Sequence, residues 1–122
     1  MFSTLVQLAL GGAIGAVLRF GTGQMALRLF GPAFPWGTMA VNVVGSFLMG
    51  VLAIWLAGGR MNPFLMTGVL GGFTTFSAFS LDAVTLWERG EAVQTGGYVL
   101  ASVVLSIAAL IAGMAVARSF SA

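Results

Sequence analysis

The residues best suited to chemistry form one stretch, Gly71 to Ser80, with the sequence GGFTTFSAFS. It holds a glycine pair, four hydroxyl groups and three phenylalanines inside an otherwise apolar segment of membrane-spanning length. An unpaired backbone group in hydrocarbon costs several kcal/mol, so we interpret the stretch as a helix break that is buried or lines a polar cavity. Because half-helix ends present carbonyl groups to cations and amide groups to anions, the stretch predicts an ion site.

Phe76 and Phe79 lie three residues apart and therefore share a face of the helix after the break, with Ser77 beside them. A phenylalanine in a membrane helix usually faces lipid or the protein core. In this polar neighbourhood we favour ion contact, because the positive edge of a phenyl ring contacts an anion without supplying a full charge. Asp82 follows near the expected interface, where we favour a capping or interfacial role over ion coupling.

Two further segments carry polar side chains at a four-residue interval, which places them on one face of a helix. The first stripe is Thr38, Asn42 and Ser46, and the second is Tyr98, Ser102 and Ser106. Asn42 is the most informative member, because an amide within a membrane needs partners and offers both donors and an acceptor. Each stripe alone is compatible with simple helix packing. Two stripes beside a broken helix favour a polar pathway.

The composition defines the elements that must position these residues. Of the 122 residues 59% are hydrophobic and only 7% are charged, against about 25% in soluble domains, which predicts an integral membrane protein. The five arginines are scattered singly, so no nucleic-acid partner is expected. The absence of cysteine and histidine excludes disulfides and the usual transition-metal ligands. No base, nucleophile and orienting group stand together, so we expect no enzyme.

Four apolar segments are long enough to cross a bilayer. They predict an all-α membrane protein, one domain over residues 1–122, with spans at about 2–30, 36–57, 64–87 (broken near its middle) and 98–117. Gly11 and Gly15 form a pattern of small residues that lets helix backbones approach closely. Arg19 follows, either as an interfacial anchor or as a group lining a vestibule.

The arginines barely select an orientation. Four spans place on one side Arg60 and Arg118, and on the other Arg19, Arg28 and Arg89. This near balance gives the positive-inside rule little to act on, so the chain is able to insert both ways. Four helices alone also make a thin bundle around a hydrated pathway. We therefore predict an antiparallel, dual-topology homodimer.

Three motifs resemble the Fluc fluoride channels, also called CrcB: GGAIGAVLRF at 11–20, GTMAVNVVGSFLMG at 37–50 and GVLGGFTTFSAFS at 68–80. The resemblance covers nearly the whole chain, and three motifs in this order on four spans make it specific. It implies a dual-topology homodimer in the cell (inner) membrane that exports fluoride passively and relieves its toxicity. It further implies two pores, a structural sodium ion at the dimer centre, contact with membrane lipid, and no other protein partner.

The same resemblance assigns individual residues. It implies a fluoride pathway formed by Phe76, Phe79, Asn42, Ser77, Tyr98, Ser102, Ser106, Thr38 and Arg19. It implies that sodium is held by the backbone carbonyls of Gly71 and Thr74 from both subunits. Ala78 departs from the hydroxyl residue that related chains often carry, and Phe20 stands where tyrosine is common.

Two other readings stay open at the level of sequence. A proton-coupled exporter of the small multidrug resistance type needs a titratable carboxylate within the membrane, for which Asp82 is the only candidate. A structural or assembly subunit would use the polar stripes only to join helices, and it would conduct no ions.

Overall fold

The computed structural model describes residues 1–56 and 62–120 and forms helices and no strands over these ranges. The elements are α1 (Phe2–Phe30), α2 (Trp36–Trp55), η1 (Pro63–Leu70), α3 (Gly71–Phe73), α4 (Ser77–Glu88) and α5 (Ala92–Ser119). The wider π-type helix η1 continues into α3, and with α4 it forms the third span. Four segments are long and apolar enough to cross a membrane, which confirms the predicted all-α class and the broken third span.

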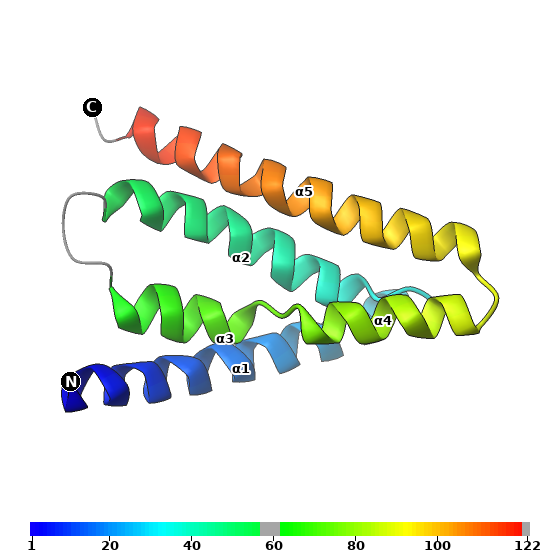
Figure 1. The fold of residues 1–122 in the computed structure, drawn as a ribbon, viewed down its shortest axis with the longest axis horizontal. Helices are drawn as coiled ribbons and strands as arrows, with labels where there is room; N and C mark the ends of the chain where they lie inside the picture. The colour runs from blue at the N-terminus through cyan, green and yellow to red at the C-terminus, as the bar shows by residue number, and fades with distance from the viewer. Residues whose placement is uncertain (57–61, 121–122) are drawn as a thin grey trace.

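The spans run lengthwise, side by side, with the start of α1 and the end of α5 at the same end of the molecule (Figure 1). The second predicted span ends at Trp55 in the structure, and residue 57 lies outside the described residues. The fourth predicted span, at about 98–117, is shorter than the helix in the structure, because α5 already begins at Ala92. A glycine costs a helix only about 1 kcal/mol, so Gly96 and Gly97 do not end it. The chain turns instead at Gly90, whose φ is 81°.

Glycines set the spacing between helices. Gly11 and Gly15 of α1 are buried, and a Cβ atom at Gly11 would lie 2.5 Å from the carbonyl oxygen of Phe64 in η1. This contact confirms the predicted close packing. On the other side of the molecule, Gly113 of α5 lies against the Phe47 carbonyl of α2, so that no Cβ atom fits. Backbone contact between neighbouring helices therefore depends on residues without side chains.

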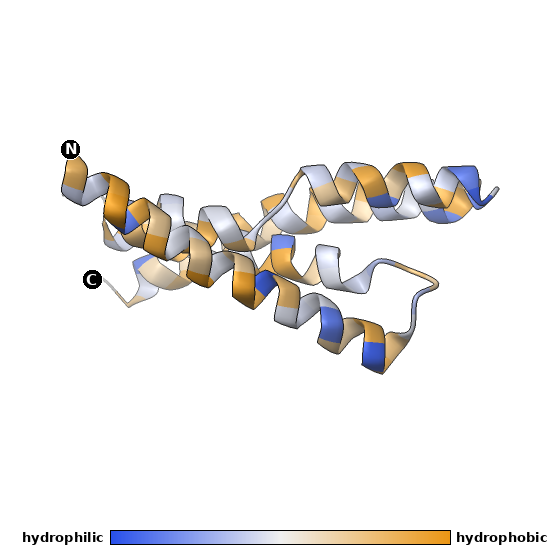
Figure 2. Ribbon diagram, turned by 90° about the horizontal axis from the view of Figure 1, so that it is seen from below, coloured by the Kyte–Doolittle hydropathy of each residue, from blue (hydrophilic) through white to orange (hydrophobic). Residues whose placement is uncertain are grey.

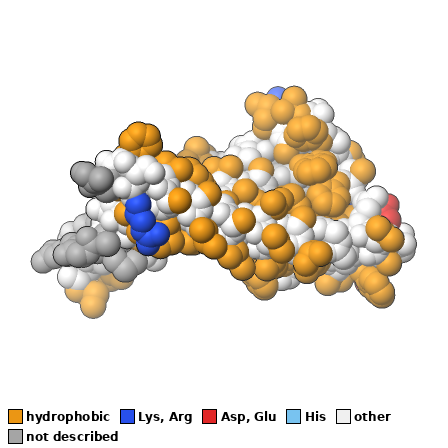
Figure 3. Space-filling model, turned by 90° about the horizontal axis from the view of Figure 1, so that it is seen from above, with side chains coloured by type: hydrophobic (Ala, Val, Ile, Leu, Met, Phe, Trp, Pro, Cys, Tyr) orange, Lys and Arg blue, Asp and Glu red, His pale blue; other side chains and the backbone are white. Residues whose placement is uncertain are grey.

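Hydrophobic residues recur along the length of the helices (Figure 2), and apolar side chains are spread over the face that Figure 3 shows. In α5 alone, Leu100 is 67% exposed, Ile107 59% and Ile111 60%. One cluster of buried side chains lies between α2, α4 and α5: Met39, Phe79, Leu86 and Tyr98. An outer surface this apolar is suited to lipid or to another copy of the chain, and not to water.

The helix contact at Gly113 gives a first test. Gly113→Ala forces a methyl group against the backbone of α2 and is expected to destabilise the protein by about 1–3 kcal/mol. Gly97→Ala is the control on the same helix, because a Cβ atom there meets nothing within 4 Å. It should be neutral or stabilising by up to about 1 kcal/mol. The thermal unfolding midpoint in detergent measures both, and equal shifts would contradict the packing described.

Candidate functional site

The break in the third span lies after the glycine pair. Gly71 and Gly72 are helical, and the chain leaves the helix at Thr74, where φ is −85° and ψ is 159°, before α4 begins at Ser77. Gly72 packs on α1, where a Cβ atom would lie 2.6 Å from the Gly12 carbonyl oxygen. The break predicted within 71–80 is therefore confirmed, but it does not begin at the glycines. They allow α1 to approach, and the unwound residues are 74–76.

Asn42 of α2 holds the unwound segment in place. Its Oδ1 accepts a hydrogen bond from the Thr75 amide at 2.8 Å, and its Nδ2 donates to the Thr75 carbonyl at 2.9 Å. Both backbone groups of Thr75 are thus paired as they would be in a helix. The Thr75 hydroxyl in turn accepts from the Ala78 amide at 3.2 Å, in the first turn of α4. The second half-helix therefore starts at a position fixed by α2.

These contacts leave two carbonyl groups of the break unpaired. In a continuous helix the Thr75 amide would donate to Gly71 and the Ala78 amide to Thr74. Both amides donate elsewhere, to Asn42 and to the Thr75 hydroxyl. Within the described residues, the carbonyl oxygens of Gly71 and Thr74 consequently have no hydrogen-bond donor. These are the two carbonyls that the family resemblance assigns as sodium ligands.

Arg19 of α1 reaches the break from the other side. It is half-buried, and its Nε donates to the Gly72 carbonyl at 3.1 Å. It also lines a cavity of about 190 Å³, here called the arginine cavity. The other lining residues are Phe20, Gly23, Gln24, Gly37, Thr38, Val41, Thr75 and Ala78. A guanidinium, an amide and two hydroxyls in one cavity provide hydrogen-bond donors suited to an anion.

A second cavity, of about 430 Å³ and here called the hydroxyl cavity, lies beside the break. It is lined by Asn42, Ser46, Gly71, Thr74, Thr75, Phe76, Phe79, Ser102, Val103, Ser106 and Ile107. The structure thus brings together most of the predicted pathway and both predicted cation ligands. Ser102 is buried, and its hydroxyl has no hydrogen-bond partner within the described residues. A buried donor without a partner is costly unless something else occupies the cavity.

The two phenylalanines of the hydroxyl cavity differ in exposure. Phe79 is 8% exposed, whereas Phe76 is 75% exposed, and their ring centroids lie 5.4 Å apart with the planes tilted by 51°. They share one wall, as their spacing predicts. Val103 and Ile107 on the facing helix are exposed as well. The cavity is therefore open on its outer side in the single chain.

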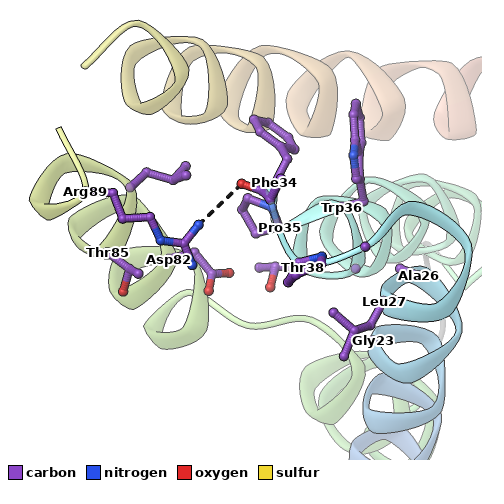
Figure 4. Close-up of a pocket in the computed structure, with 15 residues that line it drawn as sticks. Gly23, Ala26, Leu27, Phe34, Pro35, Trp36, Thr38, Asp82, Thr85 and Arg89 are labelled. Atoms are coloured by element: carbon purple, nitrogen blue, oxygen red, sulfur yellow. Dashed lines mark hydrogen bonds between the residues drawn. The ribbon is translucent and has the colours of Figure 1, made fainter. Parts of the chain in front are cut away.

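A third hollow, here called the mouth pocket, has a volume of about 240 Å³ and lies where α4 meets the loop between α1 and α2 (Figure 4). Thr38, Asp82 and Arg89 are among its lining residues, and Arg89 donates to the Ala33 carbonyl at 3.5 Å. Asp82 accepts a hydrogen bond from the fully buried hydroxyl group of Tyr98 at 3.2 Å. The Tyr98 hydroxyl thus donates to Asp82. Tyr98 does not line the hydroxyl cavity with Ser102 and Ser106.

The three hollows adjoin one another in series. Thr38, Gly23 and Gly37 line both the mouth pocket and the arginine cavity. Thr75 lines both the arginine cavity and the hydroxyl cavity. The hydrogen-bonded pair of Asn42 and Thr75 therefore stands between the last two.

Sequence reasoning omitted Thr75 from the predicted site, although it stands at the centre. The available signal was its position, because a threonine just before a helix commonly caps that helix with its hydroxyl. Ser77, which was predicted, is exposed and lies 3.4 Å from the Thr75 hydroxyl. Gln24 of the arginine cavity carried no sequence signal.

The fold and the site define a multi-spanning α-helical membrane protein with polar cavities beside a broken helix. Residues 6–114 match the family model described as CrcB-like protein, Camphor Resistance (CrcB). The chain belongs to this family, which confirms the predicted resemblance.

Relatives match over nearly their whole length. The chain is 65% identical over 124 residues to a fluoride-specific ion channel FluC of Cereibacter sphaeroides, with 100% of both chains covered. It is 63% identical over 119 residues to the protein of that name from Rhizobium etli, covering 93% of this chain and 94% of the relative. A Paracoccus denitrificans protein of the same name is 56% identical over 125 residues, again with 100% of both chains covered. The chain is a multi-pass integral protein of the cell membrane.

The role of Asn42 in holding the break is directly testable. Asn42→Leu keeps the branched shape and the number of side-chain heavy atoms but leaves both backbone groups of Thr75 unpaired, so we expect a destabilisation of about 2 kcal/mol or more. Ser46→Ala is the control on the same face of α2, and it should change stability by less than about 0.5 kcal/mol. Thermal unfolding in detergent compares them. An Asn42→Leu protein as stable as Ser46→Ala would show that the pair does not hold the break.

Proposed function

We propose that this protein is a passive, selective fluoride channel that exports fluoride from the cytoplasm across the inner membrane and relieves its toxicity. Relatives matched over nearly their full length carry the name fluoride-specific ion channel. The observation that carries the proposal is the series of three adjoining cavities, of which the arginine cavity and the hydroxyl cavity meet at the pair of Asn42 and Thr75. The prediction that the chain is not an enzyme agrees with relatives named as ion channels.

The pathway uses several weak contacts in succession. A hydrated anion enters the mouth pocket, passes the Arg19 guanidinium and the Thr38 hydroxyl, and reaches the hydroxyl cavity. There Ser102 and Ser106 offer O–H donors, and Asn42 keeps one N–H that its contact with the Thr75 carbonyl does not use. The ring edges of Phe76 and Phe79 add attraction without a full charge. No single contact is strong enough to trap the ion, so it leaves again.

The proposal includes an antiparallel homodimer with two pores and a central sodium ion. Two facts support it: the hydroxyl cavity is open on its outer side, and apolar residues cover the outer faces of the helices. The carbonyls of Gly71 and Thr74 supply only two oxygen ligands from one chain, fewer than a hard cation takes. A two-fold axis doubles the set to four. Backbone carbonyls at a broken helix are suited to sodium.

The exporter reading is not favoured. Asp82 is held by Tyr98 and lines the mouth pocket, away from the hydroxyl cavity. A proton-coupled mechanism would instead require this carboxyl group to exchange its proton during transport. The reading as a structural subunit predicts no ion flux at all.

Anion efflux from liposomes tests the channel. Purified protein should release fluoride rapidly and retain chloride, and Phe76→Ile should slow fluoride release about tenfold, because the aliphatic side chain lacks the positive ring edge. Phe120→Ile is the control, since Phe120 is 81% exposed at the end of α5, far along the chain from the break.

Three outcomes would count against parts of the proposal. Absence of fluoride release from folded protein would exclude the channel. Unchanged release from Phe76→Ile would remove Phe76 from the pathway. Loss of transport in Asp82→Asn, with proton flux that follows substrate flux in the wild type, would favour the exporter.

Sodium should stabilise the dimer. Replacing sodium by N-methylglucamine, which is too large for a site of backbone carbonyls, is expected to lower the unfolding midpoint and to increase the monomer fraction. Sodium at about 100 times its dissociation constant contributes about 2.7 kcal/mol. Readdition of sodium should restore both. Equal stability and an intact dimer in the two salts would leave the cation site without support.

A further inference from the structure

The contact between Arg19 and Gly72 joins the first transmembrane helix to the end of the first half of the broken one. The helix that contains η1 and α3 ends at Phe73, so the Gly72 carbonyl can no longer accept a hydrogen bond from the amide four residues later, as it would in a continuous helix. The Arg19 Nε donates to it at 3.1 Å. Carbonyl groups at a helix C-terminus carry partial negative charge, which a cationic donor stabilises.

Because Nε is the atom that contacts Gly72, the Arg19 side chain is able to have two roles. A guanidinium has five N–H donors, and Nε is the one nearest the backbone. Using it for Gly72 leaves four donors on the outer nitrogens for the arginine cavity. Arg19 is therefore able to fix the break and to attract an anion at the same time.

We propose that Arg19 is a positioning residue that caps the first half-helix at Gly72, in addition to any attraction that its charge exerts on anions. With this cap, the carbonyl groups at the break fall into two sets, those that have a donor in the protein and those that do not. Arg19 pairs Gly72 and Asn42 pairs Thr75. Within the described residues the carbonyls of Gly71, Phe73 and Thr74 have no donor, and Gly71 and Thr74 are the two that the proposed function assigns to a cation. The identities of the ions rest on the proposed function, whereas the proposal that Arg19 caps the first half-helix does not rest on it.

Side-chain geometry allows the cap to be separated from the charge. The Nε2 of glutamine is bonded to Cδ, as the Nε of arginine is, so Arg19→Gln places a neutral N–H donor at the same distance along the side chain. Arg19→Met removes both the donor and the charge. Arg19→Lys keeps the charge but moves its nitrogen one bond further out. Arg28→Gln is the control for loss of a positive charge on α1, because Arg28 is exposed.

Hydrogen–deuterium exchange of residues 70–78 in lipid nanodiscs measures the effect on the break, through amides such as those of Thr74 and Thr75. Arg19→Met should exchange there about tenfold faster than the wild type, as expected for loss of a hydrogen bond to a charged group. Arg19→Gln and Arg28→Gln should remain close to the wild type.

Exchange in Arg19→Gln as fast as in Arg19→Met, or protection kept by Arg19→Lys alone, would overturn the cap, because charge would then be the property that matters. If Arg19→Met does not fold, the comparison of Arg19→Gln with Arg19→Lys still shows whether the Nε donor or the positive charge protects the break. Fluoride efflux measured on the same samples tests the proposed channel separately from the proposed cap. A wild type without efflux would count against the channel and would leave the exchange result unaffected.

Discussion

The pairing of the Asn42 side chain with both backbone groups of Thr75 is the interaction on which the rest of the site depends. A helix interrupted within a membrane must satisfy the amide and carbonyl groups that the interruption releases, because hydrocarbon offers them no hydrogen-bond partner. Two hydrogen bonds from a neighbouring helix meet this requirement at Thr75. They also fix where α4 begins, and thereby the positions of Phe76 and Phe79.

The arrangement around the break follows from how closely the helices approach. Gly11, Gly15 and Gly72 allow α1 to lie directly on the backbone of η1 and α3. This short separation brings Arg19, on the same helix as two of these glycines, within reach of the Gly72 carbonyl. A larger side chain at Gly15 or Gly72 would displace α1 and with it the guanidinium. Packing by small residues and placement of charge are thus parts of one constraint.

Several features of the site are incomplete in a single chain. The hydroxyl cavity is open at Phe76, and the buried Ser102 hydroxyl has no partner within the described residues. The carbonyls of Gly71, Phe73 and Thr74 have no donor there either. Each of these has a physical cost that an ion or a second copy would remove. Membership of the CrcB family agrees with this interpretation, since its compared relatives are named as ion channels. These unsatisfied groups support the proposed dimer, cation site and anion pathway.

The sequence by itself determined the membrane class, the four spans, the existence of a break and the faces carrying Asn42, Ser102 and Ser106, because composition and periodicity are local properties. It did not determine the start of α5 at Ala92, since the cost of two glycines is small against the remaining helix. Only the tertiary structure decided that the unwound residues are 74–76, that Tyr98 binds Asp82 and that Arg19 binds Gly72. These contacts join residues far apart in the chain, and their partners depend on which helices become neighbours.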